Sequence, residues 1–231
     1  MIDKQKNYEK IKEFALNAGA NLFGVADISG NRVEFDDEIS GIASKMPFAV
    51  AIAVKLSRSV LATVNDRPTK IYKTHYKSAN TRLDSLAFSV GREIELLGYN
   101  ALPIPASYIT DWQKQKAHAG HKNIAELAGI GWRGRNNLVV SPEYGPLIRL
   151  VSVLTDMPLK TDKPLTFSCG GCFECVDCCP AGAIKERVED FDHIACFEML
   201  RRFMKDKNFG QYICGICITK CPLSDGRDKK S

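Results

Sequence analysis

The stretch CGGCFECVDCCPAGAI, residues 169–184, holds five cysteines within eleven positions and then turns through Pro-Ala-Gly. Four of these cysteines have the spacing C-x2-C-x2-C-x3-C, and Pro180 follows the last: Cys169, Cys172, Cys175 and Cys179. In this spacing three thiolates hold one corner of an iron–sulfur cubane, while the fourth reaches a different cluster. Structural zinc prefers two Cys-x-x-Cys-like pairs separated by a longer loop, so zinc fits this spacing poorly.

A second half-motif lies further along the chain. Cys214, Cys217 and Cys221 repeat the C-x2-C-x3-C spacing, with Pro222 after the last cysteine, but no third cysteine stands just upstream. Cys196 can fill that position if an insertion has displaced it. The crossed pattern then predicts two [4Fe-4S] clusters. The first set of ligands is Cys169, Cys172, Cys175 and Cys221, and the second set is Cys179, Cys196, Cys214 and Cys217.

Cys178 is the ninth cysteine. We interpret it as a spare core thiol, with a ligand or redox role as the alternative, because using it in place of Cys179 would break both the x3 spacing and the Cys-Pro pair. All nine cysteines lie between Cys169 and Cys221. Clustered cysteines in a reducing compartment indicate metal rather than disulfides. The sequence therefore predicts a domain boundary within the connector 158–168, giving an α/β domain at 1–160 and a ferredoxin-like domain at 161–231.

Composition and charge limit the function classes. The 231 residues are 45% hydrophobic and 26% charged, as in globular proteins. The charged N-terminus lacks the apolar region of a signal peptide, and the longest apolar run, Phe48–Val54, is far too short for a bilayer, so we expect a cytoplasmic protein without a membrane partner. Residues 1–160 hold 21 Lys and Arg against 16 Asp and Glu, whereas residues 161–231 hold 11 of each. Bound clusters would make the C-terminal segment acidic.

Hydrophobic periodicity predicts an α/β fold for residues 1–160. Apolar residues at helical spacing predict a helix that Gly19 closes, and another from Pro68 to Gly98. The continuous apolar run of residues 47–54 is typical of a strand in a sheet that is covered on both faces. A short helix at about 122–128 and strands at 137–141 and 147–155 complete the pattern. We therefore expect three layers, with helices on both faces of a mixed sheet.

Two further stretches carry a family resemblance. The segment ELAGIGWRGRNNLVVSPEYGPLIRLVSVLTDMPL, residues 126–159, is similar to a segment of epoxyqueuosine reductases and their relatives, the reductive dehalogenases. The segment THYKSANTRLDSLA, residues 74–87, resembles a helix of the same family, and the C-terminal segment resembles bacterial two-cluster ferredoxins. With the displaced Cys196, the resemblance covers about two-thirds of the chain.

The resemblance implies a fold and a chemistry. It implies an α/β domain of the nitroreductase and cobalamin-processing type that holds a cobalamin, with the clusters passing electrons to its cobalt. The implied reaction is the reduction of a small or nucleoside-like substrate, and the implied donor is a low-potential protein such as a ferredoxin or flavodoxin. Arg135 replaces the family's lysine, and Gln115 stands where the family has its catalytic aspartate. No helical-repeat extension follows, so we expect a substrate other than epoxyqueuosine and do not expect tRNA as a partner.

Several side chains are candidates for the site. We predict Asp111 as a proton donor and Tyr108 and Tyr76 as its catalytic neighbours, the alternative for Tyr76 being a core residue. The resemblance points to Arg133, Arg135 and Asn136 as cofactor-binding residues after the glycines of AGIGWRGRN, and His75 joins them; surface arginines at a tight turn are the alternative. We expect His118 and His121 to lie in a solvent-facing loop rather than to bind a metal.

The leading hypothesis is an iron–sulfur oxidoreductase that uses cobalamin. One alternative is an electron carrier or corrinoid-activating partner without a substrate of its own. Another is a flavin-dependent reductase that binds FMN on the same fold. No G-x-G-x-x-G element follows a strand, which argues against a dinucleotide-binding Rossmann domain. The basic residues are dispersed and no recognition motif is present, so the sequence gives little support for nucleic-acid binding.

Overall fold

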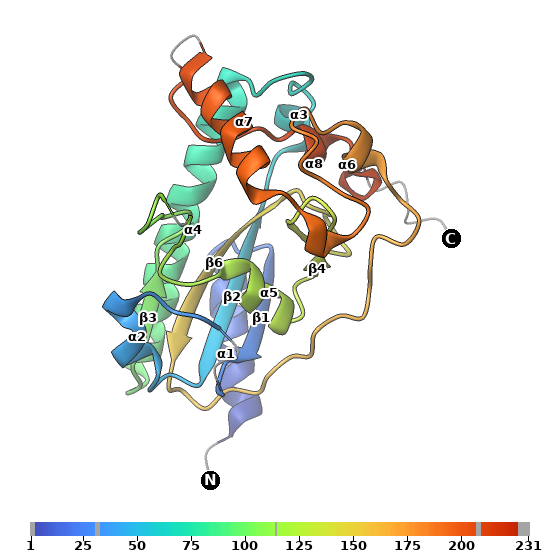
Figure 1. Ribbon diagram of the computed structural model, residues 1–231. Coiled ribbons are helices and arrows are strands. Elements are labelled where there is room, and N and C mark those ends of the chain that lie inside the picture. The colour runs from blue at the N-terminus through green and yellow to red at the C-terminus, as the bar shows by residue number, and fades with distance from the viewer. Residues whose placement is uncertain (1–2, 31–32, 114, 207–208, 226–231) are drawn as a thin grey trace. The chain divides into compact units, whose positions relative to one another are not determined.

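The computed structural model describes residues 3–30, 33–113, 115–206 and 209–225 (Figure 1). The chain forms two compact units. The first unit comprises Met1–Val54, Ala79–Gly131 and Arg149–Leu165, and the second comprises Lys55–Ser78, Trp132–Ile148 and Thr166–Ser231. The predicted boundary between residues 160 and 161 stays a prediction. The cysteine-rich segment lies in the second unit together with two segments that precede it in the sequence.

A four-stranded sheet forms the centre of the first unit. Its strands are β1 (Leu22–Asp27), β2 (Phe48–Lys55), β6 (Ile148–Thr155) and β3 (Ala101–Ile104), in the order β1-β2-β6-β3. The pairs β1–β2 and β3–β6 are antiparallel, with Gly24 opposite Ala51 and Leu102 opposite Leu154. Every residue of β2 from Ala49 to Val54 is buried. The apolar run therefore forms a strand that is covered on both faces, as predicted.

Two neighbouring residues of β1 show that helices cover both faces of the sheet. The ring of Phe23 packs edge-on against Tyr8 of α1 (Lys4–Asn17), with 5.5 Å between the ring centroids. A Cβ on Gly24 would lie 2.1 Å from the carbonyl oxygen of Ala128, at the end of α5 (His121–Leu127). Successive strand residues point to opposite faces, so α1 and α5 lie on opposite sides of β1.

The same alternation holds at the other edge of the sheet. Gly91 of α4 (Lys70–Leu96) approaches Pro103 of β3, where an added Cβ would lie 2.7 Å from the proline Cγ. Pro103 is paired with Val153, and the adjacent Ser152 hydroxyl contacts the ring of His121 in α5. The predicted three-layer α/β fold is thereby confirmed.

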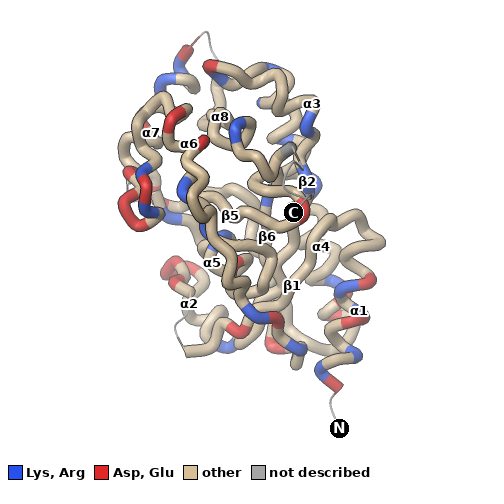
Figure 2. Tube along the Cα trace, turned by 90° about the vertical axis from the view of Figure 1, so that its right-hand side faces the viewer, with Lys and Arg blue, Asp and Glu red and all other residues tan. Residues whose placement is uncertain are grey.

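Local signals fix the helix ends. The side chain of Asp3 accepts a hydrogen bond from the backbone N–H of Lys6 and so caps α1. Gly19 and Gly98 have φ of +102° and +87°, and they end α1 and α4 as predicted. Figure 2 shows that basic and acidic residues follow one another closely along α1, which is typical of a solvated helix face.

The second unit consists of short elements. Besides the start of α4, up to Ser78, the described elements are α3 (Arg58–Leu61), the two-stranded pair β4 (Trp132–Arg133) and β5 (Val139–Val140), α6 (Glu174–Asp177), the 3-10 helices η1 (Val188–Asp190) and η3 (Pro222–Asp225), α7 (His193–Lys205) and α8 (Ile216–Thr219). The remaining helix, α2 (Asp37–Ala43), belongs to the first unit. In the part of the chain that the structure describes, no helix has the length and hydropathy that a bilayer span requires.

Candidate metal centre and site residues

Four cysteines from distant parts of the sequence line one cavity in the second unit. The cavity has a volume of about 50 Å³, and its walls are otherwise largely apolar. Its sulfur-bearing residues are Cys179, Cys196, Cys214 and Cys217, which are the second predicted set of cluster ligands. Pro180, Ile184, Phe191, Met199 and Leu200 are among the apolar residues that complete the wall.

Helix α7 and the turn before α8 position these thiols. The side chain of Asp192 accepts a hydrogen bond from the backbone N–H of Ala195 and caps α7, whose cavity-facing side carries Cys196. Gly215, between Cys214 and Cys217, has φ of +86°. A Cβ at Gly215 would lie 2.7 Å from Cε1 of Tyr72, so the turn that presents both thiols requires glycine.

The first predicted set of thiols also gathers in this unit. Burial, as the largest cause, and the nearby Cys169, Cys221, Cys178 and Cys172, in that order, together raise the pKa of Cys175 to about 12. Burial likewise raises the pKa of Cys221 to about 11, with contributions from Cys169 and Cys172. The charges of these four cysteines therefore act on one another at short range.

The second set shows the same mutual effect. Burial raises the pKa of Cys214 to about 11, and Cys196 and Cys179 add to the rise. Burial also raises the pKa of Cys217 well above its usual range, with Cys214 as the largest neighbouring charge. Crowded, buried thiols of this kind lose their protons only if a cation compensates the negative charge. The donor set therefore fits a metal centre.

A zinc site provides a length scale for the sulfur atoms. Tetrahedral zinc with bonds of about 2.3 Å would bring its sulfur ligands to about 3.8 Å from one another. Among the described residues, no cysteine belongs to a group of three ligand atoms that all lie within 4.8 Å of one another. The group that meets this criterion consists of Asp36, Glu38 and His118 in the first unit.

Cys178 differs from its neighbours. Its thiol donates a hydrogen bond to the backbone carbonyl of Cys175 with an S···O distance of 3.6 Å, and it is absent from the residues that line the cavity. Burial raises its pKa, and Cys179 adds to the rise. These contacts are those of a packed thiol.

Arg135 contacts the loop that carries the first cysteines. Its guanidinium donates hydrogen bonds to the carbonyl oxygens of Gly170 at 2.8 Å, Cys172 at 3.0 Å and Glu186 at 2.6 Å. It also lies over the ring of Phe173, 4.3 Å from the centroid. The contacts of Arg135 in the structure are therefore with the cysteine loop, and its predicted role in cofactor binding stays a prediction.

The neighbouring residues form a chain of hydrogen bonds that the sequence analysis missed. Arg133 donates from Nη1 to Oδ1 of Asn137 at 2.9 Å, and Nδ2 of Asn137 lies 2.9 Å from Nε2 of His193. An arginine only donates, so Oδ1 of Asn137 faces Arg133 and Nδ2 donates to His193. Asn137 has φ of +56°, a conformation that asparagine tolerates better than most residues. Asn136 is buried and lines the cavity of the second thiol set.

Trp132 was also missed. Its indole nitrogen is buried and has no hydrogen-bond partner among the described residues. The ring packs against Phe167 with 5.7 Å between centroids. A buried indole N–H of this kind has the chemistry to donate to a bound water or to a ligand.

Two predicted residues lie at the start of α4, in the second unit. Nε2 of His75 accepts a hydrogen bond from the backbone N–H of Ser57 at 2.8 Å, and burial lowers the pKa of His75. Tyr76 is buried and packs edge-on against Tyr72, 6.3 Å between centroids. These contacts agree with the core interpretation of Tyr76, and the catalytic and cofactor-binding roles of the two residues stay predictions.

Tyr108 and Asp111 lie in the first unit. Tyr108 is 56% exposed and stacks on His118, with 5.5 Å between the ring centroids and 3° between the planes. The half-buried Asp111 accepts a hydrogen bond from the backbone N–H of Gln113 at 2.8 Å. The predicted site residues are therefore divided between the two units, with Tyr108 and Asp111 in one and the rest in the other.

His121 differs from expectation. It is the first residue of α5 rather than part of a solvent-facing loop, and its ring nitrogens contact the Ser152 hydroxyl and the Pro105 carbonyl, both at 3.0 Å. Burial lowers its pKa. Its neighbour His118 contacts Glu38 at 3.9 Å.

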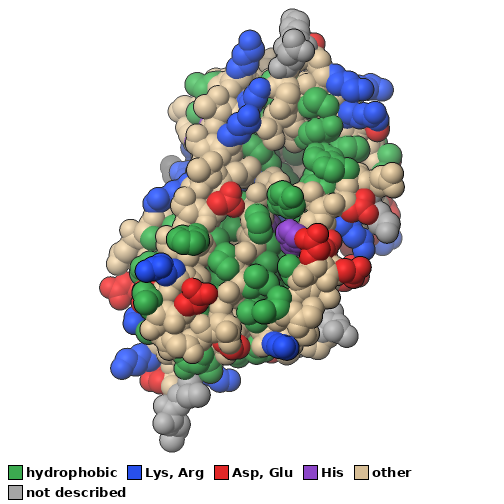
Figure 3. Space-filling model, turned by 90° about the vertical axis from the view of Figure 1, so that its left-hand side faces the viewer, with side chains coloured by type: hydrophobic (Ala, Val, Ile, Leu, Met, Phe, Trp, Pro, Cys, Tyr) green, Lys and Arg blue, Asp and Glu red, His purple; other side chains and the backbone are tan. Residues whose placement is uncertain are grey.

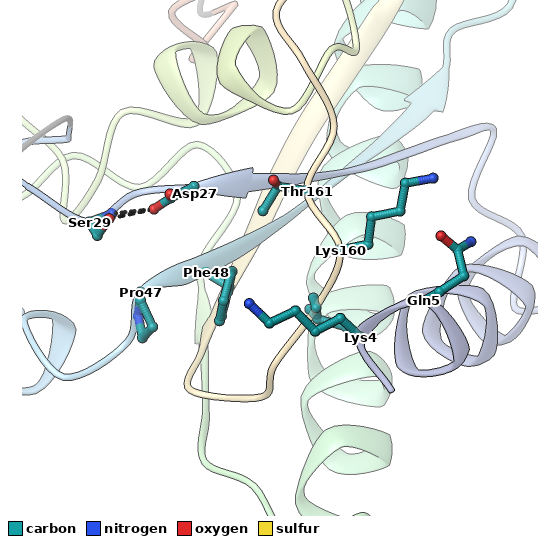
Figure 4. A pocket seen from close by; sticks show the side chains of 9 residues that line it. Lys4, Gln5, Asp27, Ser29, Pro47, Phe48, Lys160 and Thr161 are labelled. Carbon is teal, nitrogen blue, oxygen red and sulfur yellow. Dashed lines mark hydrogen bonds between the residues drawn. The ribbon is translucent and has the colours of Figure 1, made fainter. Parts of the chain in front are cut away.

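A larger hollow of about 530 Å³ lies at one end of the sheet in the first unit (Figure 4). Lys4, Phe48 and Thr161 are among its lining residues, and none of the predicted site residues belongs to them.

Part of this chain is similar in sequence to known reductases. No protein-family model matches the chain. An epoxyqueuosine reductase of Bacillus cereus is 36% identical over 112 residues, which are 46% of this chain and 30% of the relative. A tetrachloroethene reductive dehalogenase of Sulfurospirillum multivorans is 30% identical over 116 residues, 45% of this chain and 23% of the relative. The chain thus spans less than a third of the length of these relatives.

Solved structures agree on the fold. A catabolic reductive dehalogenase in complex with 3-bromo-4-hydroxybenzoic acid has a TM-score of 0.81 at 22% identity, covering 97% of this chain and 33% of its own. A second reductive dehalogenase, for which a mechanism of B12-dependent dehalogenation is suggested, has a TM-score of 0.68 at 22% identity over 80% of this chain and 26% of its own.

An epoxyqueuosine reductase with an epoxyqueuosine-modified tRNA stem loop has a TM-score of 0.58 at 20% identity, covering 95% of this chain and 66% of its own. Because this relative binds a tRNA stem loop, the expectation against a tRNA partner is not retained. The resemblance to epoxyqueuosine reductases and reductive dehalogenases that the motifs predict is confirmed, by the sequences of curated relatives and by the folds of solved structures.

Proposed function

We propose that this chain is an iron–sulfur reductase in which eight of the nine cysteines hold two [4Fe-4S] clusters in the crossed pattern. The observation that carries this proposal is the cavity of the second unit, where Cys179, Cys196 and the pair Cys214 and Cys217 meet from three separate segments of the chain. The mutual effect of Cys169, Cys172, Cys175 and Cys221 on one another's pKa supports a second centre beside it. The curated relatives are named as reductases, which supports an enzymatic role.

Cobalamin is the cofactor that we propose for the reduction. The B12-dependent mechanism suggested for a dehalogenase of similar fold supports it. The buried indole N–H of Trp132, which has no acceptor among the described residues, supports a bound group beside β4. We assign the contacts with the cofactor to Trp132 and Arg133. A bound corrinoid supplies the low-valent metal that breaks the substrate bond.

Asp111 supplies the proton in this proposal. Its carboxylate is half-buried in the first unit and is held by the backbone N–H of Gln113. A carboxyl group that loses more of its solvent when substrate covers it gains proton affinity and becomes a better general acid. Tyr108 lies three residues before Asp111 in the sequence, and its side chain is largely exposed. In this proposal it contacts the substrate.

The substrate class is a small or nucleoside-like molecule that accepts electrons and a proton. Because the match covers less than a third of the two curated relatives described above, the substrates of the relatives serve as probes for this chain. The first two probes are a halogenated phenol and an epoxyqueuosine-containing tRNA stem loop. The low-potential donor that feeds the clusters is a ferredoxin or a flavodoxin.

The deciding experiment is a cofactor analysis of protein purified without oxygen, reconstituted with iron and sulfide, and supplied with hydroxocobalamin. Iron, sulfide, corrinoid and flavin are measured per chain after desalting. About eight irons and one corrinoid are expected. Eight irons without corrinoid or flavin would leave an electron carrier, eight irons with bound FMN would leave a flavin enzyme, and zinc in place of iron would remove the basis of the proposal. Trp132→Phe should lower corrinoid retention and leave the iron content unchanged.

A further inference from the structure

We infer that the outward face of α7 is the docking surface through which an acidic one-electron donor protein reduces this chain. The inference rests on the proposed function, because it needs a metal centre to receive the electron. It adds the place of entry, which neither the cysteine motifs nor the comparisons assign.

Helix α7 separates the second thiol set from solvent. Cys196, Met199 and Leu200 line the cavity from one side of the helix. An α-helix with its side chains is about 10–12 Å across, so a protein seated on the opposite side would lie about one helix diameter from the cavity.

The opposite side of α7 combines an apolar residue with basic ones. Ile194 is 64% exposed, and positions 198, 201, 202 and 205 follow it at helical spacing, all of them exposed. Figure 3 shows Lys and Arg side chains next to hydrophobic ones on the surface of the molecule. This exposed set, Ile194, Glu198, Arg201, Arg202 and Lys205, is here called the α7 face.

The charge on the α7 face is net positive. Arg201 forms an ion pair with Glu198 at 3.3 Å, which leaves Arg202 and Lys205 in excess, and no ion pair joins either of these to another described residue. Both lie in the last turn of the helix, where cations also stabilise the helix dipole. A dipole role requires the positive charges but predicts no effect on a partner protein, so the two roles can be separated.

A basic surface is needed at this place for an electrostatic reason. Residues 161–231 carry equal numbers of acidic and basic residues, and two oxidised clusters with their thiolates would add about two negative charges each. An acidic donor would be repelled by such a segment unless basic residues steer it to one face. Electrostatic steering of this kind raises association rates by about 10 to 1,000-fold and weakens as ionic strength rises. Small, transient interfaces are typical of electron-transfer pairs.

The test uses an acidic flavodoxin as the donor, reduced to its hydroquinone. One electron passes from the hydroquinone, which becomes the semiquinone, to an oxidised cluster. The second-order rate of cluster bleaching is measured by stopped flow at several ionic strengths, and binding of the two oxidised proteins is measured separately. Arg202→Glu/Lys205→Glu should slow reduction at low salt by about tenfold or more and weaken binding, with the difference shrinking at high salt.

Two control proteins make the result specific. Lys6→Glu/Lys45→Glu changes the net charge equally at exposed positions of the first unit, and the donor should reduce its clusters at the wild-type rate. Arg202→Lys/Lys205→Arg keeps the charges and should also behave as wild type. Iron and sulfide are measured first, so missing clusters would count against the proposed function. Equal rates for both charge-reversed proteins, or a wild-type rate independent of salt, would overturn the assignment of the α7 face.

Discussion

Arg135 and Cys172 are joined by a hydrogen bond of 3.0 Å from the guanidinium to the backbone carbonyl, although 37 positions separate them in the sequence. The same guanidinium also holds the carbonyl oxygens of Gly170 and Glu186. One side chain therefore fixes the loop that begins the first thiol set. Hydrogen bonds from a charged group contribute about 1.5–3 kcal/mol each, so losing three of them should loosen this loop strongly.

Arg135→Ala should release iron to an anaerobic chelator at least tenfold faster than the wild-type protein. Arg135→Lys keeps the charge, but its ammonium group cannot reach three carbonyls as a planar guanidinium does. Its rate of iron release should therefore lie between those of the wild-type protein and Arg135→Ala. Arg58→Ala, at an exposed position of the same unit, is the control and should release iron at the wild-type rate. Wild-type release by Arg135→Ala would show that the loop is held by the cluster alone.

Cys178 and Cys179 provide a matched pair of substitutions. Cys179 lines the cavity of the second thiol set, whereas Cys178 donates to a backbone carbonyl. Cys178→Ser should retain about eight irons per chain, because a hydroxyl can replace the donor. Cys179→Ser should lose about four, since one cluster lacks a ligand. Iron analysis and electron paramagnetic resonance of the reduced proteins would distinguish the two; equal loss in both would give Cys178 a role as ligand.

The two cysteine sets stay a prediction from the sequence, which can make it because covalent spacing limits which thiols can hold one cubane. Cys196 was identified because the second half-motif has one ligand too few and Cys196 can supply it. The contacts of Arg135, Asn137 and His193 could not be predicted in this way. They join segments 35 to 56 positions apart, and no local pattern marks which donor meets which distant acceptor.

The fold shows the same division between local and distant information. The buried strand β2 and the glycine-ended helices α1 and α4 follow from short patterns of apolar residues and glycines. The grouping of residues 55–78 and 132–148 with the cysteine-rich segment follows from tertiary contacts such as the close approach of Gly215 to Tyr72. The expectation of a solvent-facing His121 was wrong because the sequence does not show that Ser152 and Pro105 lie beside its ring.

His75 should stabilise the protein by holding the backbone of the segment before α3. Its Nε2 accepts the N–H of Ser57, so the imidazole is neutral with its proton on Nδ1. His75→Leu leaves this N–H without its acceptor and should lower the free energy of unfolding by about 1–3 kcal/mol. His75→Gln offers a carbonyl oxygen and should lower it less. Urea unfolding with hydrogen exchange of residues 56–62 would check this; equal exchange in both variants would contradict it.

His121 should make the first unit less stable at acidic pH. Burial lowers its pKa in the folded protein, whereas the unfolded chain titrates near the ordinary value of about 6.5. Below that pH the unfolded state binds the additional proton, so the free energy of unfolding falls as pH decreases, by at most about 1.4 kcal/mol per pH unit for one group. Above about pH 7 both states are neutral and this contribution to the pH dependence vanishes.

The measurement is hydrogen exchange of peptides from α5 and β6 between pH 5.5 and 7.5, corrected for the intrinsic exchange rate. The wild-type protein should lose protection in both elements as the pH falls, because a protonated ring cannot accept the Ser152 hydroxyl at its other nitrogen. His121→Gln, which cannot take up a proton, should show a lower but flatter protection. A wild-type profile as flat as that of His121→Gln would mean that the ring is protonated equally in the folded and unfolded states.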